Sequence, residues 1–329
     1  MVPGAGGRGR WRWASALVVL SLVSALAWVA IDRDWARSSA GRPGWLAWVT
    51  RVAGPASPAL VDGELWERGL WVRGTGPRFV PQGLALAGDG TAYLSGYRKT
   101  TPRAPHCRVF RVDLSTGRIL ARSTSILGAS GERCRHAGAL ALTREGLWLT
   151  QRDRLWLLDP ALGPRPTRRS WALRAPVSGS VMTVDGRSLH LAGWLPHRPT
   201  RRQVFDLDRV LDAGVLALGE SPGAGVLAPL ATGRAPSRTQ GLVVVRGRPW
   251  FVRSTTFCGV VGRRPGGPAA LVPGAEGVAV ARDGTWWVVS ESGSVPYQRL
   301  GGRPSVPTLV RLDPDRLVRQ RGPACDWRS

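Results

Sequence analysis

The chain has 329 residues and a formal net charge of +24, with 46 Lys and Arg against 22 Asp and Glu. A charge of this size suggests nucleic-acid binding, but the arginines are scattered without a single run and Lys99 is the only lysine. We therefore expect no nucleic-acid partner. A solvated basic surface accounts for the charge, and attraction to anionic lipid headgroups or anionic envelope polymers is the sharper alternative.

The first predicted element is a membrane segment. Arginines at positions 8, 10 and 12 precede the uncharged run 14–31, and mixed charges follow it at 32–34. The roughly 18 apolar or small residues reach the lower limit for a transmembrane helix. The positive-inside rule then places residues 1–13 in the cytoplasm and everything after the span outside. A cleaved signal peptide is the alternative, because Ala25-Leu26-Ala27 is a suitable cleavage site, and it would make the protein secreted.

Residues 32–63 are rich in Gly, Pro, Ala and Ser and lack a sustained period, so we interpret them as a spacer before a single domain at 64–329. All four cysteines fall in that domain, which suits an oxidising compartment. The absence of a C-x-x-C pair argues against a zinc site. Three disulfide pairings are open, and we favour Cys107 with Cys134 and Cys258 with Cys325. Four buried free thiols are the alternative.

One pattern returns five times in the domain: a glycine, an alternating Leu, Val and Ala run, a turn containing glycine, and a strand with an aromatic or His residue. The first copy runs from Gln82-Gly83-Leu84 through Asp89-Gly90 to Tyr93, and the last from Glu276-Gly277-Val278 through Asp283-Gly284 to Trp287. Each copy predicts a β-hairpin. Repetition at a period of tens of residues predicts an all-β propeller. The repeat glycines are Gly83, Gly138, Gly179, Gly241 and Gly277.

Five blades follow from five copies, with outer strands predicted at 108–113, 155–160, 203–206 and 308–314. We expect the segment 65–72 to pair with the C-terminal blade and close the ring. A sixth, degenerate blade could lie between Val210 and Leu230, where two short runs look like strands.

The innermost strands of a propeller line its central channel, so the polar residues at or near the position before each repeat glycine should converge at one mouth. The ends of the aromatic strands add 95–97, 150–151, 254–255 and 291–292. Convergent polar groups predict a ligand site, and the alternative is that they satisfy one another and trapped water. The candidate ligand-binding residues are Gln82, His136, Ser178, Gln240, Glu276 and Glu291.

The repeat resembles the superfamily of six-bladed propellers that includes gluconolactonases, strictosidine-synthase-like proteins and NHL-repeat modules. The strand starts Gln82-Gly83-Leu84-Ala85, Gln240-Gly241-Leu242 and Glu276-Gly277-Val278-Ala279 carry this resemblance. The whole pattern, including Glu291-Ser292-Gly293 and Tyr297, is most similar to uncharacterised exported propeller proteins of actinobacteria, for which no activity is implied.

The resemblance to lactonases implies calcium or another divalent metal at the channel mouth, held by a Glu and by Asp or Asn ligands. Glu276 matches that Glu, and Glu291 could be a second ligand. Gln82, Ser178 and Gln240 depart from the pattern and leave fewer oxygens than a hard cation prefers. We therefore expect no cofactor and favour a non-catalytic role, with a metal-dependent, lactonase-like hydrolase as the alternative.

Physical arguments also exclude two other kinds of catalytic site, a serine hydrolase site and a zinc metalloprotease site. The run 219–223 matches G-x-S-x-G, but Pro222 lacks the N–H that the oxyanion hole requires. The four histidines lack the spacing of a metalloprotease site, and His190 falls in the aromatic column, where it is expected to pack between blades. The sequence thus predicts a single-pass, extracytoplasmic propeller that binds a ligand or acts as a scaffold at the cell envelope, and it leaves the oligomeric state open.

Overall fold

The computed structural model describes residues 66–72, 74–76, 78–99, 105–123, 125–263, 269–298, 300, 306, 308–313, 315 and 325. The predicted cytoplasmic segment, membrane span and spacer lie outside these residues. Within the described part of the chain, no helix is both long and apolar enough to span a membrane.

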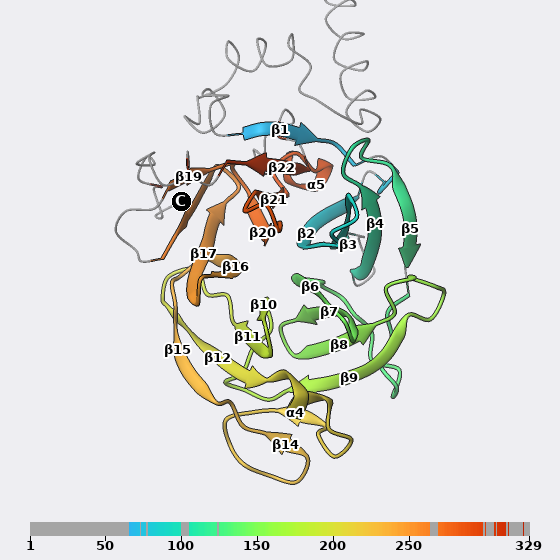
Figure 1. Cartoon of the computed structure of the whole chain (residues 1–329), viewed down its shortest axis with the longest axis vertical. Coiled ribbons are helices and arrows are strands. Elements are labelled where there is room, and N and C mark those ends of the chain that lie inside the picture. Colours follow the sequence, from blue (N-terminus) through green and yellow to red (C-terminus); the bar gives the residue numbers. More distant parts are fainter. Residues whose placement is uncertain are drawn as a thin grey trace, which may run out of the picture.

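Five sheets surround a common axis, as the all-β propeller prediction requires (Figure 1). The innermost strands β2, β6, β10, β16 and β20 contact one another in that order, and β20 returns to β2. The ring is therefore closed.

Four sheets have the four strands of a standard blade. The first contains β2 (Phe79–Leu86), β3 (Thr91–Arg98), β4 (His106–Asp113) and β5 (Ile119–Ser123). The third contains β10 (Val181–Asp185), β11 (Ser188–Ala192), β12 (Thr200–Asp206) and β15 (Ala231–Ala235). The fourth contains β16 (Thr239–Val245), β17 (Arg248–Thr255), β18 (Cys258–Gly262) and β19 (Ala269–Leu271). The fifth contains β20 (Ala275–Val280), β21 (Trp286–Ser290), β22 (Leu309–Leu312) and β1 (Trp66–Leu70).

The second sheet has six strands. Its first four are β6 (Ala139–Thr143), β7 (Gly146–Gln151), β8 (Arg154–Leu158) and β9 (Thr167–Leu173), and β13 (Ala217–Leu218) and β14 (Val226–Leu227) extend its outer edge. The last two strands come from the stretch in which a sixth blade could have lain. They are two residues long and pair in parallel, β13 with β9 and β14 with β13, so this stretch forms no separate blade.

The fifth sheet joins the two ends of the domain. β1 pairs antiparallel with β22, with Gly69 opposite Val310 and Leu70 opposite Leu309. The predicted closing strand is confirmed. The two short helices, α4 (Leu207–Leu211) and α5 (Val295–Gln298), lie outside the sheets.

The repeat glycines stand where neighbouring innermost strands meet. A Cβ on Gly83 would lie 2.8 Å from backbone atoms of Ala139, and one on Gly277 would lie 2.6 Å from the Gln82 carbonyl oxygen. Real Cβ atoms do not approach backbone so closely, so the repeat keeps glycine because the inner strands touch backbone to backbone.

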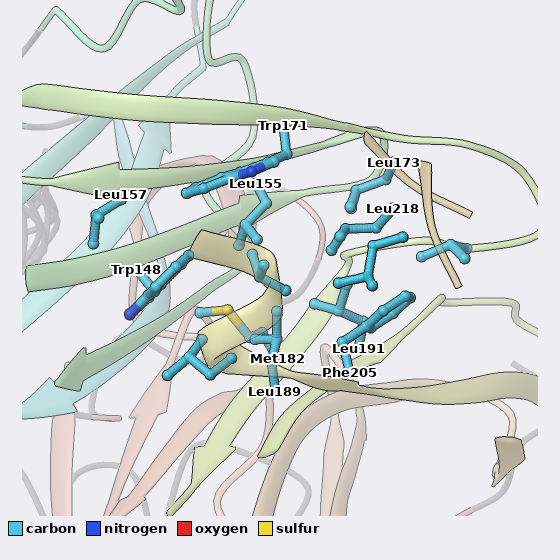
Figure 2. Packing of buried hydrophobic residues seen from close by; sticks show 14 of the residues in the cluster. Trp148, Leu155, Leu157, Trp171, Leu173, Met182, Leu189, Leu191, Phe205 and Leu218 are labelled. Carbon is cyan, nitrogen blue, oxygen red and sulfur yellow. The ribbon is translucent and has the colours of Figure 1, made fainter. Parts of the chain in front are cut away.

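Between sheets the space is filled by large side chains, as Figure 2 shows for the second and third sheets. The indoles of Trp148 and Trp171 stack with their centroids 5.4 Å apart, and the Trp148 N–H donates to the Thr143 hydroxyl at 3.0 Å. His190 is buried and lies 2.8 Å from an Arg202 guanidinium nitrogen. The prediction that His190 packs within the blades is thus confirmed.

Both favoured disulfides are present. Cys107 is joined to Cys134 and Cys258 to Cys325, and no described cysteine is free. The second bond links the chain near its C-terminus to the first residue of β18, so it holds that end against the fourth sheet.

We expect Gly83→Ala to lower the free energy of unfolding by about 1–3 kcal/mol, because the new methyl group would force two backbones apart. Thermal denaturation of the full chain measures the effect. Gly214→Ala is the matched control, since nothing lies within 4 Å of the Cβ it would add. Equal melting temperatures for the two variants would contradict the backbone contact as the reason for the repeat glycine.

Candidate functional site

Three innermost strands are irregular at the residue before the repeat glycine. The pairing register shifts between Pro81 and Leu84 in β2, between Thr239 and Gly241 in β16, and between Ala275 and Val278 in β20. A β-bulge redirects the side chain of the extra residue. The side chains of Gln82, Gln240 and Glu276 belong to these bulges.

Two of these bulges bring Gln82 and Glu276 to one place, where Glu291 joins them from the turn after β21. The Gln82 Nε2 donates to Glu291 Oε2 at 2.8 Å and to the carbonyl oxygen of Pro81 at 3.0 Å. Glu276 also hydrogen-bonds Glu291. All three side chains are deeply buried, with exposed fractions of 1% for Glu276 and 4% for each of the other two.

The backbone after β21 fixes the position of Glu291. Its N–H donates to the Gly274 carbonyl at 2.9 Å. On either side, the Ser290 hydroxyl donates to the Pro273 carbonyl at 2.7 Å, and the Ser292 hydroxyl donates to the Thr256 carbonyl at 3.3 Å. The carboxyl is therefore held in place by its own turn.

Burial is the main cause that raises the pKa of both carboxyls. The neighbouring Glu291 raises the pKa of Glu276 further, whereas the hydrogen bonds that Glu291 accepts from Tyr297, Glu276 and Gln82 favour its ionised form. These raised pKa values favour protonation of the carboxyls at neutral pH, and Glu276 is the donor in its hydrogen bond to Glu291. We call these two residues the acid pair.

Aromatic and basic groups surround the acid pair. Tyr297 of α5 hydrogen-bonds both Glu291 and Tyr97 of β3, and burial raises the pKa of Tyr97 to about 12, so its hydroxyl stays protonated. The Lys99 Nζ lies 6.0 Å from the Tyr297 ring centroid and lowers the pKa of Glu291 through its charge. The charge of the lysine thus favours the ionised form of Glu291.

His136 joins this group indirectly. Its ring lies on that of Tyr97, with centroids 4.6 Å apart and an interplanar angle of 31°. The residue is solvent-accessible on one side, yet the crowding of its ring by protein lowers its pKa. The neutral imidazole is thus favoured, and it forms an aromatic wall together with Tyr97.

The remaining predicted residues lie apart from the acid pair. Among the described residues, no hydrogen bond joins Gln240 or Ser178 to either carboxyl. Ser178 precedes β10, which has no bulge, and it borders a cavity between the second and third sheets. Only part of the predicted set of six candidate residues therefore converges on the acid pair.

Some of the strand-end residues have structural roles. The Ser95 hydroxyl donates to the Ala137 carbonyl at 3.0 Å and accepts from the Gly83 N–H at 3.2 Å. Ser95 thus agrees with the alternative interpretation, in which polar groups at the strand ends satisfy one another's hydrogen bonds rather than bind a ligand. Tyr97 and Gln151 belong to strand ends that the sequence analysis singled out. Lys99 was not predicted to belong to the site, and Tyr297 was named only as part of the resemblance to exported propeller proteins.

The ligand set for a metal is small. Glu276 and Glu291 are the two carboxyls at this site, and no group of three or more His, Cys, Asp or Glu in the described part of the chain could hold a metal ion. The two carboxyls already hydrogen-bond each other. The described donors therefore do not fit the lactonase-type metal site, and metal binding by Glu276 stays a prediction.

No known protein family matches the sequence, and no curated protein matches it significantly. Similar folds occur among solved structures. A putative oxidoreductase (glucose dehydrogenase) of Thermus thermophilus has 16% identity over 74% of this chain and 86% of its own, with a TM-score of 0.39. The PQQ-bound aldose sugar dehydrogenase of Streptomyces coelicolor has 13% identity over 75% and 84%, with a TM-score of 0.39.

An α-L-arabinofuranosidase of Clostridium thermocellum has 12% identity over 73% of this chain and 90% of its own, with a TM-score of 0.42. Similarities this low carry no argument about function. The propeller assignment is based on the five sheets themselves.

The acid pair should make the protein less stable as pH rises. A carboxyl whose pKa is raised on folding binds more protons in the folded state, so its stabilising contribution is present at low pH and is lost as pH rises through the raised pKa. We expect Glu276→Gln to flatten the decline of melting temperature between about pH 5 and 8, since the amide donates to Glu291 without titrating. Each proton contributes at most about 1.4 kcal/mol per pH unit.

Thermal melts of the full chain across this pH range provide the measurement, and titrating groups common to both proteins cancel in the comparison. Asp159→Asn, which removes an exposed carboxylate paired with Arg168 at 2.9 Å, is the control. Parallel wild-type and Glu276→Gln curves would show that the pair holds no extra proton.

Proposed function

We propose that the chain is a membrane-anchored, extracytoplasmic binding module that takes up a small, hydroxyl-rich ligand, such as a sugar or polyol, at the acid pair. The observation that carries this proposal is the convergence of Gln82, Glu276 and Glu291, from the first and fifth sheets, into one buried polar group.

The energetics of the acid pair favour a role in binding. Burying carboxyls costs free energy that apolar residues of similar size would not cost. One oxygen of the group, Glu276 Oε1, is buried and has no hydrogen-bond partner among the described residues. An unsatisfied acceptor of this kind is complemented by a hydrogen-bond donor, which a ligand hydroxyl supplies.

The surroundings favour a neutral, polar ligand. The carboxyls offer no positive charge to an anion, and Lys99, near the Tyr297 ring, opposes cations. The stacked rings of Tyr97 and His136 offer an apolar face beside the polar groups. A sugar presents both hydroxyls and an apolar C–H face, so it suits an aromatic wall next to carboxyls.

The location is proposed from the sequence. The uncharged run 14–31 after a basic N-terminus supports a single membrane span with the propeller outside. Two disulfides in the domain are typical of an oxidising compartment. If residues 14–31 are cleaved instead, the same domain is secreted.

The alternative function, a metal-dependent lactonase-like hydrolase, requires a divalent ion to replace the hydrogen bond between the two carboxyls. It is tested with the same protein by calcium titration. Metal-dependent stabilisation together with lactone hydrolysis, both abolished by Glu276→Gln, would favour the enzyme and overturn the binding proposal.

We expect a panel of neutral monosaccharides and polyols, tested by calorimetry on the full chain in detergent, to contain a ligand whose affinity falls at least tenfold in Glu276→Met, which removes the unsatisfied oxygen. Leaving the ligand's donor without an acceptor costs about 1–3 kcal/mol, and tenfold corresponds to about 1.4 kcal/mol. Asp159→Asn should bind normally. A ligand bound equally by wild type and Glu276→Met would place its site elsewhere.

A further inference from the structure

A second candidate site lies between the second and third sheets, apart from the acid pair. It is a cavity of about 730 Å³, within the range of about 300–1,000 Å³ that small-ligand pockets occupy. The β7–β8 turn, the connection from β9 to β10 and the β11–β12 turn enclose it. These segments belong to the same end of the propeller as Glu291, because each follows the second or fourth strand of its antiparallel sheet, as Glu291 follows the second strand β21.

Backbone hydrogen bonds tie the three segments to the body of the propeller. Gly179 N–H donates to the Arg152 carbonyl at 3.1 Å, and Arg238 N–H donates to the Leu195 carbonyl at 2.8 Å. The Thr200 hydroxyl closes the β11–β12 turn by donating to the Gly193 carbonyl at 2.9 Å. Prolines at 196 and 199 fix two further φ angles in that turn. The cavity is therefore largely pre-formed.

The charged groups that line the cavity are mainly basic. Arg152, Arg198 and Arg201 face one carboxylate, Asp153. Asp153 accepts from the Gln151 amide at 2.6 Å. Arg201 is paired with Glu220 at 3.0 Å, but no ion pair within the described residues engages Arg152 or Arg198. Two guanidiniums thus remain available to an anion.

An aromatic side chain stands beside these arginines. Trp194 lines the cavity and is 39% exposed, whereas most of the tryptophans whose side chains the structure describes are buried. Ser178, Ser180 and Thr200 contribute hydroxyls to the same lining. This set of groups suits an acidic sugar. The indole can stack on the apolar face of the sugar ring, the protein hydroxyls can bond the sugar hydroxyls, and the guanidiniums can bind the acidic group.

We propose that this cavity binds a sugar unit bearing a carboxylate or a phosphate, such as one residue of an anionic glycan. Arg152 and Arg198 engage the anionic group, since guanidiniums bind carboxylate and phosphate through paired N–H donors. Trp194 stacks on the ring. The site goes beyond the function proposed for the acid pair and does not depend on it.

The test is calorimetric titration of the full chain with three probes: digalacturonate, glucose 6-phosphate and neutral glucose. We expect at least one of the two acidic probes to bind at least tenfold more tightly than glucose at this site. The acidic probe that binds more tightly identifies the preferred anionic group as carboxylate or phosphate. Arg198→Ala and Arg152→Ala should each weaken that binding about tenfold, and Trp194→Ala should weaken it while Trp194→Phe retains it.

Arg248→Ala is the matched control, because it removes the same charge from an exposed position in the β16–β17 hairpin. It should leave binding unchanged, as should Glu276→Gln, so the two proposals fail independently. An equal loss in Arg248→Ala and Arg198→Ala would show general attraction to the basic surface and overturn the proposal. Inorganic phosphate or anionic lipid vesicles binding as tightly as the sugar, with no effect of Trp194→Ala, would also overturn it.

Discussion

The close backbone contact between neighbouring innermost strands is the constraint on which the rest of the domain depends. At Gly83 and Gly277 the next strand lies so near that no side chain fits. The pairing register shifts at the same positions, and the side chains of Gln82 and Glu276 both contact Glu291 there. The close contact of the inner strands and the convergence of the polar groups thus occur at the same residues.

Burying the acid pair costs free energy of folding. The carboxyls lose hydration, and this loss together with their mutual repulsion raises the pKa of Glu276. Gln82 and Tyr297 satisfy Glu291, whereas one oxygen of Glu276 stays unsatisfied. Groups of this kind commonly mark functional sites, where stability is sacrificed for chemistry. The cavity near Trp194 has the opposite character, being open, basic and formed mainly by turns.

The repeat made much of this architecture predictable. Period, hairpin turns and glycines indicated the blades, the closing strand and the proximity of Gln82 to Glu276, because each depends on local pattern. Glu291 could be predicted as a site residue because it directly follows an aromatic strand of the repeat. Ser178 could not be placed in this way: it precedes a strand without a bulge and borders a different cavity, so its position before a repeat glycine did not bring it to the acid pair. Tyr297 and Trp194 lie in connections whose path depends on tertiary packing, which no period in the sequence records.

The pairing of β1 with β22 has a consequence for how the domain is made. The first strand of the propeller is synthesised long before its partner, which comes after every other described strand. Until that partner is available, the edge that should receive β22 and the whole of β1 carry unsatisfied backbone groups, which are prone to pair with other chains. Proper assembly therefore requires that synthesis has passed β22, and a product truncated before Leu309 would leave an open ring with a free strand at its start.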